Sequence, residues 1–295
     1  MSDAREVTPE LLRAFPLPHH PEDSDKEGRG RLLVIAGSRE LAGAALLAGL
    51  GGLRSGAGKL QIATAESIAV HIGIAVPEAR VIPHKETDSG CIDESEVEPL
   101  LKWAKGAQAV TLGCGLQSGE SLDALLDALL ASGIDIPLVL DAAVLGSLGR
   151  RAEALTAWKG GAIVLPHAGE MAGLLDEEKE AIAADPEAAA RRAAETFGVV
   201  AVLKGRFTRI VAPDGRAFLY EGGGVGLATS GSGDTLAGIV GGLCARGADP
   251  LTAAMWGVYL HGEAGRTLSL KVGRIGFLAR ELLDLVPGLM DKAST

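Results

Sequence analysis

The chain has 295 residues and a net charge of −10 at pH 7, and 47% of its residues are apolar. Such an acidic chain is a poor candidate for broad electrostatic binding to nucleic acid or to anionic membranes, and no apolar run reaches the length of a membrane span. The N-terminal sequence MSDAREVTPE is too charged for a secretory signal. The three cysteines, Cys91, Cys114 and Cys244, are far apart, which predicts neither a disulfide framework nor a zinc site. We therefore expect a cytoplasmic protein with reduced thiols.

Residues 1–30 are polar and rich in proline, which predicts an irregular lead-in with a short helix near residues 8–14. Regular structure then begins with the apolar run LLVIA at 32–36, which Gly37 and Ser38 close. A short apolar run bounded by such residues is typical of a buried strand. The Ala- and Leu-rich residues 42–54 predict a helix, and KLQIAT at 59–64 predicts the next strand.

Strands and helices continue to alternate along the chain. Strands are predicted at 109–112, 138–141, 161–165 and 201–204, and helices at 121–132 and about 186–197. A hairpin over 208–221 turns at Asp214-Gly215, and helices follow at about 233–246, 251–269 and 276–285. This order favours one α/β domain over residues 31–290, with a central, mostly parallel sheet covered on both faces. Such sheets bind ligands at the carboxyl ends of their strands.

The glycine-rich segment LATSGSGDTLAGIVGGL, residues 227–243, carries the strongest chemical signal. Its small residues lead directly into a helical pattern, so free amides at the helix start would form a hole for a transferred phosphoryl group. Asp234 lies in the first helical turn, where its carboxylate could take a proton from an attacking hydroxyl. The alternative is that Asp234 only caps a helix.

The segment LKGRFTRIV, residues 203–211, places Lys204 and Gly205 at the end of a predicted strand, with Thr208 at the start of the hairpin. Gly205 lets the chain turn where a ligand approaches, while Lys204 and Thr208 offer a cation and a hydroxyl to phosphate oxygens. The alternative is a solvent-exposed lysine at a strand end.

The segment IVLPHAGEMAGLL, residues 163–175, puts His167 and Glu170 at the carboxyl end of another strand. His167 could donate a hydrogen bond to a polar substrate, and Glu170 could hold a water on a divalent cation. The alternative is that Glu170 caps its helix and His167 is an ordinary loop residue.

Residues 31–63 exclude two common nucleotide-binding classes. Gly58-Lys59 is followed by Leu60, so there is no P-loop, and no G-x-G-x-x-G motif follows the first strand. Neither a P-loop ATPase nor an ordinary Rossmann dehydrogenase is therefore supported.

Together the segments resemble the nucleotide-dependent NAD(P)H-hydrate dehydratases, a branch of the ribokinase-like superfamily. The resemblance spans about residues 26–285. It rests on an ordered set of motifs: GLRSGAG at 52–58, PEARVIP at 77–83, LPHAGE at 165–170, LKGRFT at 203–208, ATSGSGDTLAG at 228–238 and YLHGEAG at 259–265. It implies a ribokinase-like three-layer α/β/α sandwich in which ADP or ATP phosphorylates the ring hydroxyl of hydrated NADH or NADPH. Loss of phosphate then restores the nicotinamide.

The resemblance also implies roles for individual residues. Asp234 would deprotonate the hydroxyl while the backbone amides of residues 231–234 (Gly231, Ser232, Gly233 and Asp234) stabilise the developing charge. The nucleotide would be bordered by Lys204, Gly205, Arg206, Phe207, Thr208 and Gly233. The hydrated cofactor would contact Ala44, Gly115, His167 and Asp234. Magnesium would be held by phosphates and by waters near Glu170, and a homo-oligomer, a tetramer in the family, would be the assembly.

The chain departs from the family pattern at three places. Ser232 replaces a threonine in the Gly-Asp element, which keeps a hydroxyl there. The family's Gly-Pro-Gly-Leu-Gly turn reads GCGLQ at 113–117, and its Asp-Ala-Asp-Ala-Leu element reads DAAVL at 141–145, which retains Asp141 and replaces the second acid by Ala143.

Two other functions are compatible with part of this pattern. A ribokinase-like kinase of a hydroxymethyl vitamin precursor or of a sugar would share the Gly-Asp anion hole. A nucleotide-binding protein without catalytic activity would share the fold. The RSGAG and PHAGE segments favour the dehydratase over the kinase, and the retained Asp234 favours an active enzyme.

Overall fold

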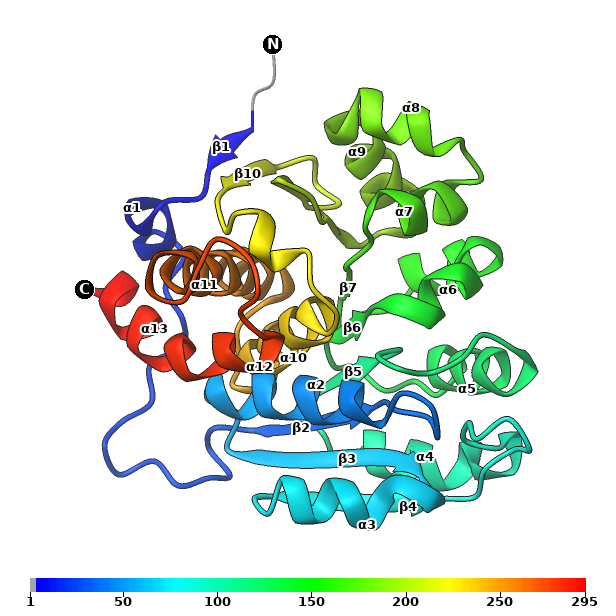
Figure 1. Ribbon diagram of the computed structural model, residues 1–295. Helices are drawn as coiled ribbons and strands as arrows, with labels where there is room; N and C mark the ends of the chain where they lie inside the picture. The colour runs from blue at the N-terminus through cyan, green and yellow to red at the C-terminus, as the bar shows by residue number, and fades with distance from the viewer. Residues whose placement is uncertain (1–3) are drawn as a thin grey trace.

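The computed structural model describes residues 4–295 and gathers its strands into one ten-stranded sheet between two layers of helices (Figure 1). The strand order is β1-β10-β9-β8-β7-β6-β5-β2-β3-β4. The strands are β1 (Arg5–Glu6), β2 (Arg31–Ile35), β3 (Lys59–Ala65), β4 (Ala79–His84), β5 (Ala109–Leu112), β6 (Leu138–Leu140), β7 (Ala162–Val164), β8 (Val200–Leu203), β9 (Phe207–Val211) and β10 (Ala217–Glu221). Only β9 is antiparallel to its neighbours among these strands, so the predicted three-layer α/β/α fold is confirmed.

Helices cover both faces of the sheet, because its strands are apolar on both sides. Along β2, Leu32 and Val34 face one apolar core, whereas Leu33 and Ile35 face the other. The first layer holds α1 (Pro9–Arg13), α2 (Ala42–Arg54), α3 (Glu66–Ala75), α10 (Ser232–Ala245), α11 (Pro250–Lys271), α12 (Ala279–Leu282) and α13 (Val286–Ser294). The second layer holds α4 (Val97–Ala104), α5 (Glu120–Ala131), α6 (Ala152–Thr156), α7 (Ala168–Leu175), α8 (Lys179–Ala184) and α9 (Pro186–Phe197).

The ends of the chain are more regular than the sequence predicts. Within the lead-in, β1 pairs with β10, and α1 begins after Thr8, whose hydroxyl accepts a hydrogen bond from the Leu11 amide. Leu11 and Leu12 of α1 are buried in the first core. The single helix predicted over 276–285 is instead α12 and a 3₁₀ turn at Leu283–Leu285, after which α13 continues the chain. Within residues 4–295 no helix has the length and apolar character needed to cross a bilayer.

The strand order reverses at β2, which creates a natural ligand-binding crevice. From β2 the chain adds β3 and β4 on one side, and then crosses to add β5 on the other. Just beyond the carboxyl ends of this pair, the Gly37 amide donates to the Cys114 carbonyl over 2.8 Å. In open α/β sheets, the crevice outside such a reversal is where ligands bind.

Glycines bring α10 into close contact with α2 beside this crevice. A Cβ on Gly238 would lie 2.1 Å from the Ala48 carbonyl oxygen, and one on Gly242 would lie 2.1 Å from Ser55 Oγ. Larger residues at these two positions would push the helices apart. The glycines therefore fix the position of α10, and with it the residues at its start.

Candidate active site

The start of α10 has the geometry of an anion hole. Gly231 precedes the helix in a left-handed conformation, with φ +84°, and its carbonyl accepts hydrogen bonds from the Thr235 amide and hydroxyl, both over 3.0 Å. No side chain within residues 4–295 caps this helix start. The Ser232 amide donates to the Thr229 carbonyl over 3.2 Å, whereas the amides of Gly233 and Asp234 are available to an anion, and the helix dipole adds partial positive charge.

Asp234 lies in that first turn and lines a cleft of 1080 Å³. Burial raises the pKa of this carboxyl above that of an ordinary aspartate, and the negative charge of Asp141 raises it further. A carboxylate with a raised pKa is a stronger proton acceptor than a solvated one. Asp234 thus combines the position and the basicity of a general base.

Lys204 faces the same part of the cleft from the end of β8. Its Nζ donates to Asp141 Oδ1 over 2.7 Å and lies 3.7 Å from Glu170 Oε2, and Asp141 is only 2% exposed. Burial lowers the pKa of Lys204, but the carboxylates of Asp141 and Glu170 outweigh this effect, so its pKa is raised and it remains a cation. Lys204 Nζ would lie 3.4 Å from a Cβ on Gly233, so the cation stands beside the anion hole.

His167 and Glu170 cap α7 and also line the cleft. His167 Nδ1 accepts the amides of Gly169 and Glu170 over 3.0 and 3.1 Å, and the His167 amide donates to Glu170 Oε2 over 2.7 Å. Because Nδ1 accepts, the neutral ring carries its proton on Nε2. The helix cap that the sequence offered as an alternative therefore exists, and it orients a hydrogen-bond donor on a side chain that is 61% exposed.

His261 of α11 lines the cleft and contacts Ser232 at the start of α10, a position that the sequence does not reveal. Its Nε2 lies 3.0 Å from Ser232 Oγ and 3.1 Å from the Ser232 carbonyl oxygen. Burial lowers the pKa of His261 to about 4, so the ring is neutral near pH 7. The motif YLHGEAG marks this histidine, but only the packing of α11 on α10 brings it to Ser232.

Cys114, at the turn after β5, is a second residue that sequence reasoning passed over. It is fully buried. Burial raises its pKa well above the usual range, and the negative charges of Asp141 and Asp234 raise it further, so the thiol stays protonated beside these carboxylates. A protonated thiol therefore stands beside the carboxyl group of Asp234.

The remaining predicted residues fall into two groups. Gly205, Arg206, Thr208, Ser232 and Gly233 line the cleft. Four others do not line it: Gly231, Phe207, Ala44 and Gly115. Phe207 is 40% exposed under the Arg206 guanidinium, which lies 5.2 Å from the ring centroid. Ala44 and Gly115 pack against each other at the crevice between β2 and β5, where a Cβ on Gly115 would lie 2.6 Å from that of Ala44.

Comparison with known proteins identifies the family of this chain. The family model described as NAD(P)H-hydrate dehydratase matches residues 32–288. The ADP-dependent (S)-NAD(P)H-hydrate dehydratase of Xanthomonas campestris is 43% identical over 98% of this chain and 96% of its own length. The crystal structure of the ADP/ATP-dependent dehydratase of Bacillus subtilis, co-crystallised with ATP and Mg²⁺, matches with a TM-score of 0.85 and 33% identity, and covers 99% of this chain and 100% of that one.

A further solved structure supports the fold assignment. A ribokinase-like superfamily protein of Enterococcus faecalis matches with a TM-score of 0.86 and 25% identity, over 100% of this chain and 98% of that one. The fold, the motif order and these relatives lead to one assignment. The chain belongs to the NAD(P)H-hydrate dehydratase family.

Proposed function

We propose that this protein repairs hydrated NADH and NADPH by nucleotide-dependent dehydration. The ring hydroxyl attacks the terminal phosphorus of ADP or ATP, which releases AMP or ADP. The phosphorylated ring then loses phosphate together with a ring proton, and this restores the double bond of the nicotinamide. The observation that carries the proposal is the raised-pKa carboxylate of Asp234 in the same helical turn as the uncapped amides of α10.

Four groups at the cleft have a role in this reaction: the Asp234 carboxylate, the amides at the start of α10, the Lys204 cation and the His167 ring. Asp234 takes the proton of the ring hydroxyl as the oxygen attacks. The amides of Gly233 and Asp234 stabilise charge on the transferred phosphoryl group, and the Lys204 cation lies beside that group. His167 Nε2 donates to the hydrated cofactor, which we place between Asp234 and the crevice at Ala44 and Gly115.

The nucleotide would occupy the part of the cleft that begins at β8 and β9. Lys204, Gly205 and Arg206 form the turn between these strands, Phe207 and Thr208 begin β9, and four of these five residues line the cleft. Beyond them the cleft is walled by Tyr220, Val225, Leu227 and Gly262, which suit an apolar base. We favour ADP over ATP as the phosphoryl donor.

Magnesium fits this site as a partner of the phosphates. Across residues 4–295 no three His, Cys, Asp or Glu side chains gather into a metal site. Mg²⁺ needs no such cage, because it keeps several waters and binds one or two carboxylates together with substrate phosphates. Glu170, at the cleft wall, would hold it through a water, and the ion would neutralise phosphate charge.

The cellular setting follows from further features. Free, buried Cys91, Cys114 and Cys244 support a reducing, cytoplasmic location. A homo-oligomer, a tetramer by family resemblance, is supported by Val70 and Ile74, which are 70% and 76% exposed on α3 beside the edge strand β4. We also propose that residues 31–290 act as a single catalytic domain.

The test is recovery of NADH absorbance from purified hydrated NADH, with ADP and ATP compared at equal concentration. We expect recovery that depends on nucleotide and stops when EDTA removes magnesium. Accumulation of a stable phosphorylated alcohol without NADH would contradict the dehydratase and favour the kinase.

A further inference from the structure

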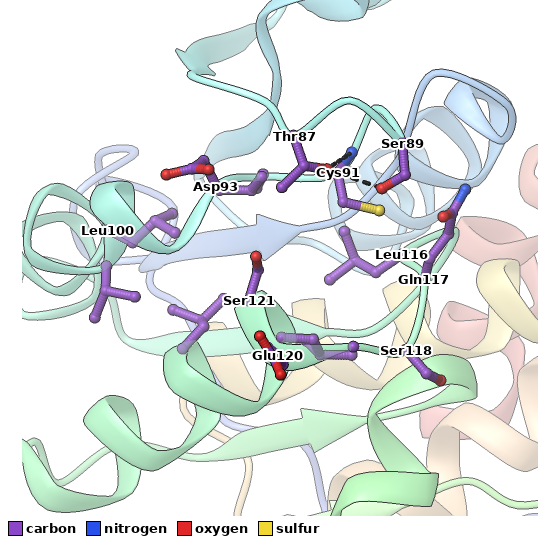
Figure 2. Close-up of a pocket in the computed structure, with 15 residues that line it drawn as sticks. Thr87, Ser89, Cys91, Asp93, Leu100, Leu116, Gln117, Ser118, Glu120 and Ser121 are labelled. Carbon is purple, nitrogen blue, oxygen red and sulfur yellow. Dashed lines mark hydrogen bonds between the residues drawn. The ribbon is translucent and has the colours of Figure 1, made fainter.

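A second cavity, of 210 Å³, lies beside the turn that follows β5 and shares no lining residue with the catalytic cleft (Figure 2). Its floor is apolar and comes mainly from Leu100, Leu116, Leu122 and Leu125. Its rim is polar and includes Thr87, Ser89, Gln117 and Ser121. An apolar floor with a few polar groups at the rim is the usual composition of a small-molecule site. None of the residues with a role in the proposed reaction lines this cavity.

One short turn separates this cavity from the catalytic cleft. Leu116 and Gln117 line the cavity and follow Gly115, which packs on Ala44 at the crevice. Ser118 also lines the cavity, and its hydroxyl donates to the Ala143 carbonyl over 3.4 Å, next to Ala142 of the cleft. Residues 115–118 therefore run from the crevice to the cavity.

A hairpin turn closes the other side of the cavity. The Thr87 amide donates to the Cys91 carbonyl over 2.7 Å, and the Gly90 amide donates back to Thr87 over 2.8 Å. Arg39, two residues beyond the Gly37 turn of β2, donates its amide to the Gly90 carbonyl over 3.1 Å and pairs with Glu86. The hairpin is thus tied to the crevice.

The size and charge of the cavity indicate which part of the substrate it suits. Sites for whole ligands occupy about 300–1,000 Å³, so 210 Å³ is enough for one end of a dinucleotide. Asp93, whose Oδ1 accepts the Ser95 amide over 2.9 Å, and Glu120 line it, and no Lys or Arg of residues 4–295 does. Carboxylates accept hydrogen bonds from a ribose 2′-hydroxyl, whereas a 2′-phosphate needs a cation.

We propose that this cavity binds the adenosine end of the hydrated dinucleotide and favours the form with a free 2′-hydroxyl, hydrated NADH. The base lies on the leucine floor, the ribose meets the carboxylates, and the pyrophosphate crosses residues 115–118. This inference rests on the proposed function, because it identifies where the far half of that substrate binds.

The first test compares hydrated NADH with hydrated reduced nicotinamide mononucleotide, which lacks the adenosine half. In the wild-type protein we expect kcat/KM for the mononucleotide to be lower by roughly tenfold or more. Equal values for the two hydrates would overturn the inference and leave the proposed function intact. Failure to restore either hydrate would instead contradict the proposed function itself.

The second test fills the cavity. Ser121 points from the start of α5 into the space between this helix and the hairpin turn (Figure 2). We expect Ser121→Phe to lower kcat/KM for hydrated NADH by roughly tenfold, while kcat/KM for the mononucleotide stays within about twofold of wild type. The control is Ala131→Phe, which adds the same ring at the exposed far end of α5. An equal loss on both hydrates, or no loss on either, would overturn the inference.

The third test needs no variant. Wild-type kcat/KM should favour hydrated NADH over hydrated NADPH by roughly tenfold. Equal values, or a preference for hydrated NADPH, would overturn the assignment of the ribose to the Asp93 and Glu120 side of the cavity.

Discussion

The two helical layers cover the same sheet by different means (Figure 1). In the first layer, α10 approaches α2 so closely that a Cβ on Gly51 or Gly238 would collide with backbone atoms of the facing helix. In the second layer, α5 packs through the side chains of Leu122, Leu125, Leu126 and Leu129. Backbone contact leaves less freedom than contact between side chains. The layer that fixes the anion hole is therefore the more rigidly determined of the two.

The catalytic cleft lies where the two layers meet. Asp234 comes from α10 of the first layer, and Glu170 comes from α7 of the second. Asp141 and Lys204, at the ends of β6 and β8, join the two sides through a partly buried ion pair. The difference in packing between the two layers can be tested at this ion pair and within each layer.

Loss of the Asp141–Lys204 ion pair should lower the free energy of unfolding more than the other substitutions that test the two layers. Lys204→Met leaves the Asp141 carboxylate buried without its cation, and we expect a loss of roughly 3–5 kcal/mol in the free energy of unfolding. The double variant Lys204→Met/Asp141→Asn should recover a large part of this loss, because the buried Asp141 charge is then removed as well. Urea denaturation of the single and double variants measures both. Additive losses from Lys204→Met and Asp141→Asn would show that the pair does not couple the layers.

The pH dependence of stability due to His261 shows whether the first helical layer excludes a positively charged imidazole. Its pKa is lowered from 6.5 to about 4 by burial, so between these values the unfolded chain binds more protons and stability rises with pH. Wild type should lose roughly 3 kcal/mol of stability as pH falls from 6.5 to 4, beyond what His261→Gln loses. Unfolding free energies of both proteins across this range provide the comparison. Parallel pH profiles of the free energy of unfolding for wild type and His261→Gln would show that burial does not lower the pKa of His261.

Gly238→Ala tests the backbone contact itself. Its methyl group would meet the Ala48 carbonyl oxygen at 2.1 Å, so α10 must shift, and we expect a loss of roughly 2 kcal/mol. Since the shift also moves the anion hole, kcat should fall in the same variant. Thermal unfolding and the NADH recovery assay measure the two effects. A stable and fully active variant would mean that the close approach of α2 and α10 is not required.

Gly173→Ala is the matched change in the second layer, with the smallest effect and the opposite sign. No atom lies within 4 Å of a Cβ built on Gly173 in α7. Alanine therefore gains helix propensity without a clash, and we expect stabilisation by roughly 0.5–1 kcal/mol. Destabilisation in the same thermal assay would remove the contrast between the layers.

The regular elements could be predicted where the apolar pattern is long and local. The predicted helices at 42–54 and about 186–197 coincide with α2 and α9, and the predicted hairpin corresponds to β9 and β10. By contrast, β1 is only two residues long and exists through its pairing with β10, far along the chain. No local pattern encodes such a pairing, because its hydrogen bonds depend on the completed sheet.

The candidate site likewise contains residues whose convergence the sequence predicts and residues whose contacts depend on the completed fold. The carboxyl ends of parallel strands meet at one edge, which predicts that Lys204 and His167 converge, whereas Asp234 reaches them through the packing of α10. The contact of His261 with Ser232 spans 29 residues and depends on how α11 packs against α10. Likewise, the positive φ of Ala142, 53°, follows from the fold around Asp141, and nothing in the local sequence demands it.

The proposed dehydration depends most on Asp234 as the proton acceptor. Asp234→Asn keeps the size of the side chain and removes its basicity, so we predict a fall in turnover of about 10³-fold with nucleotide affinity unchanged. Recovery of NADH absorbance from its hydrate, measured together with calorimetric binding of ADP, tests this directly. An Asp234→Asn variant that restored hydrated NADH at the wild-type rate would contradict the account.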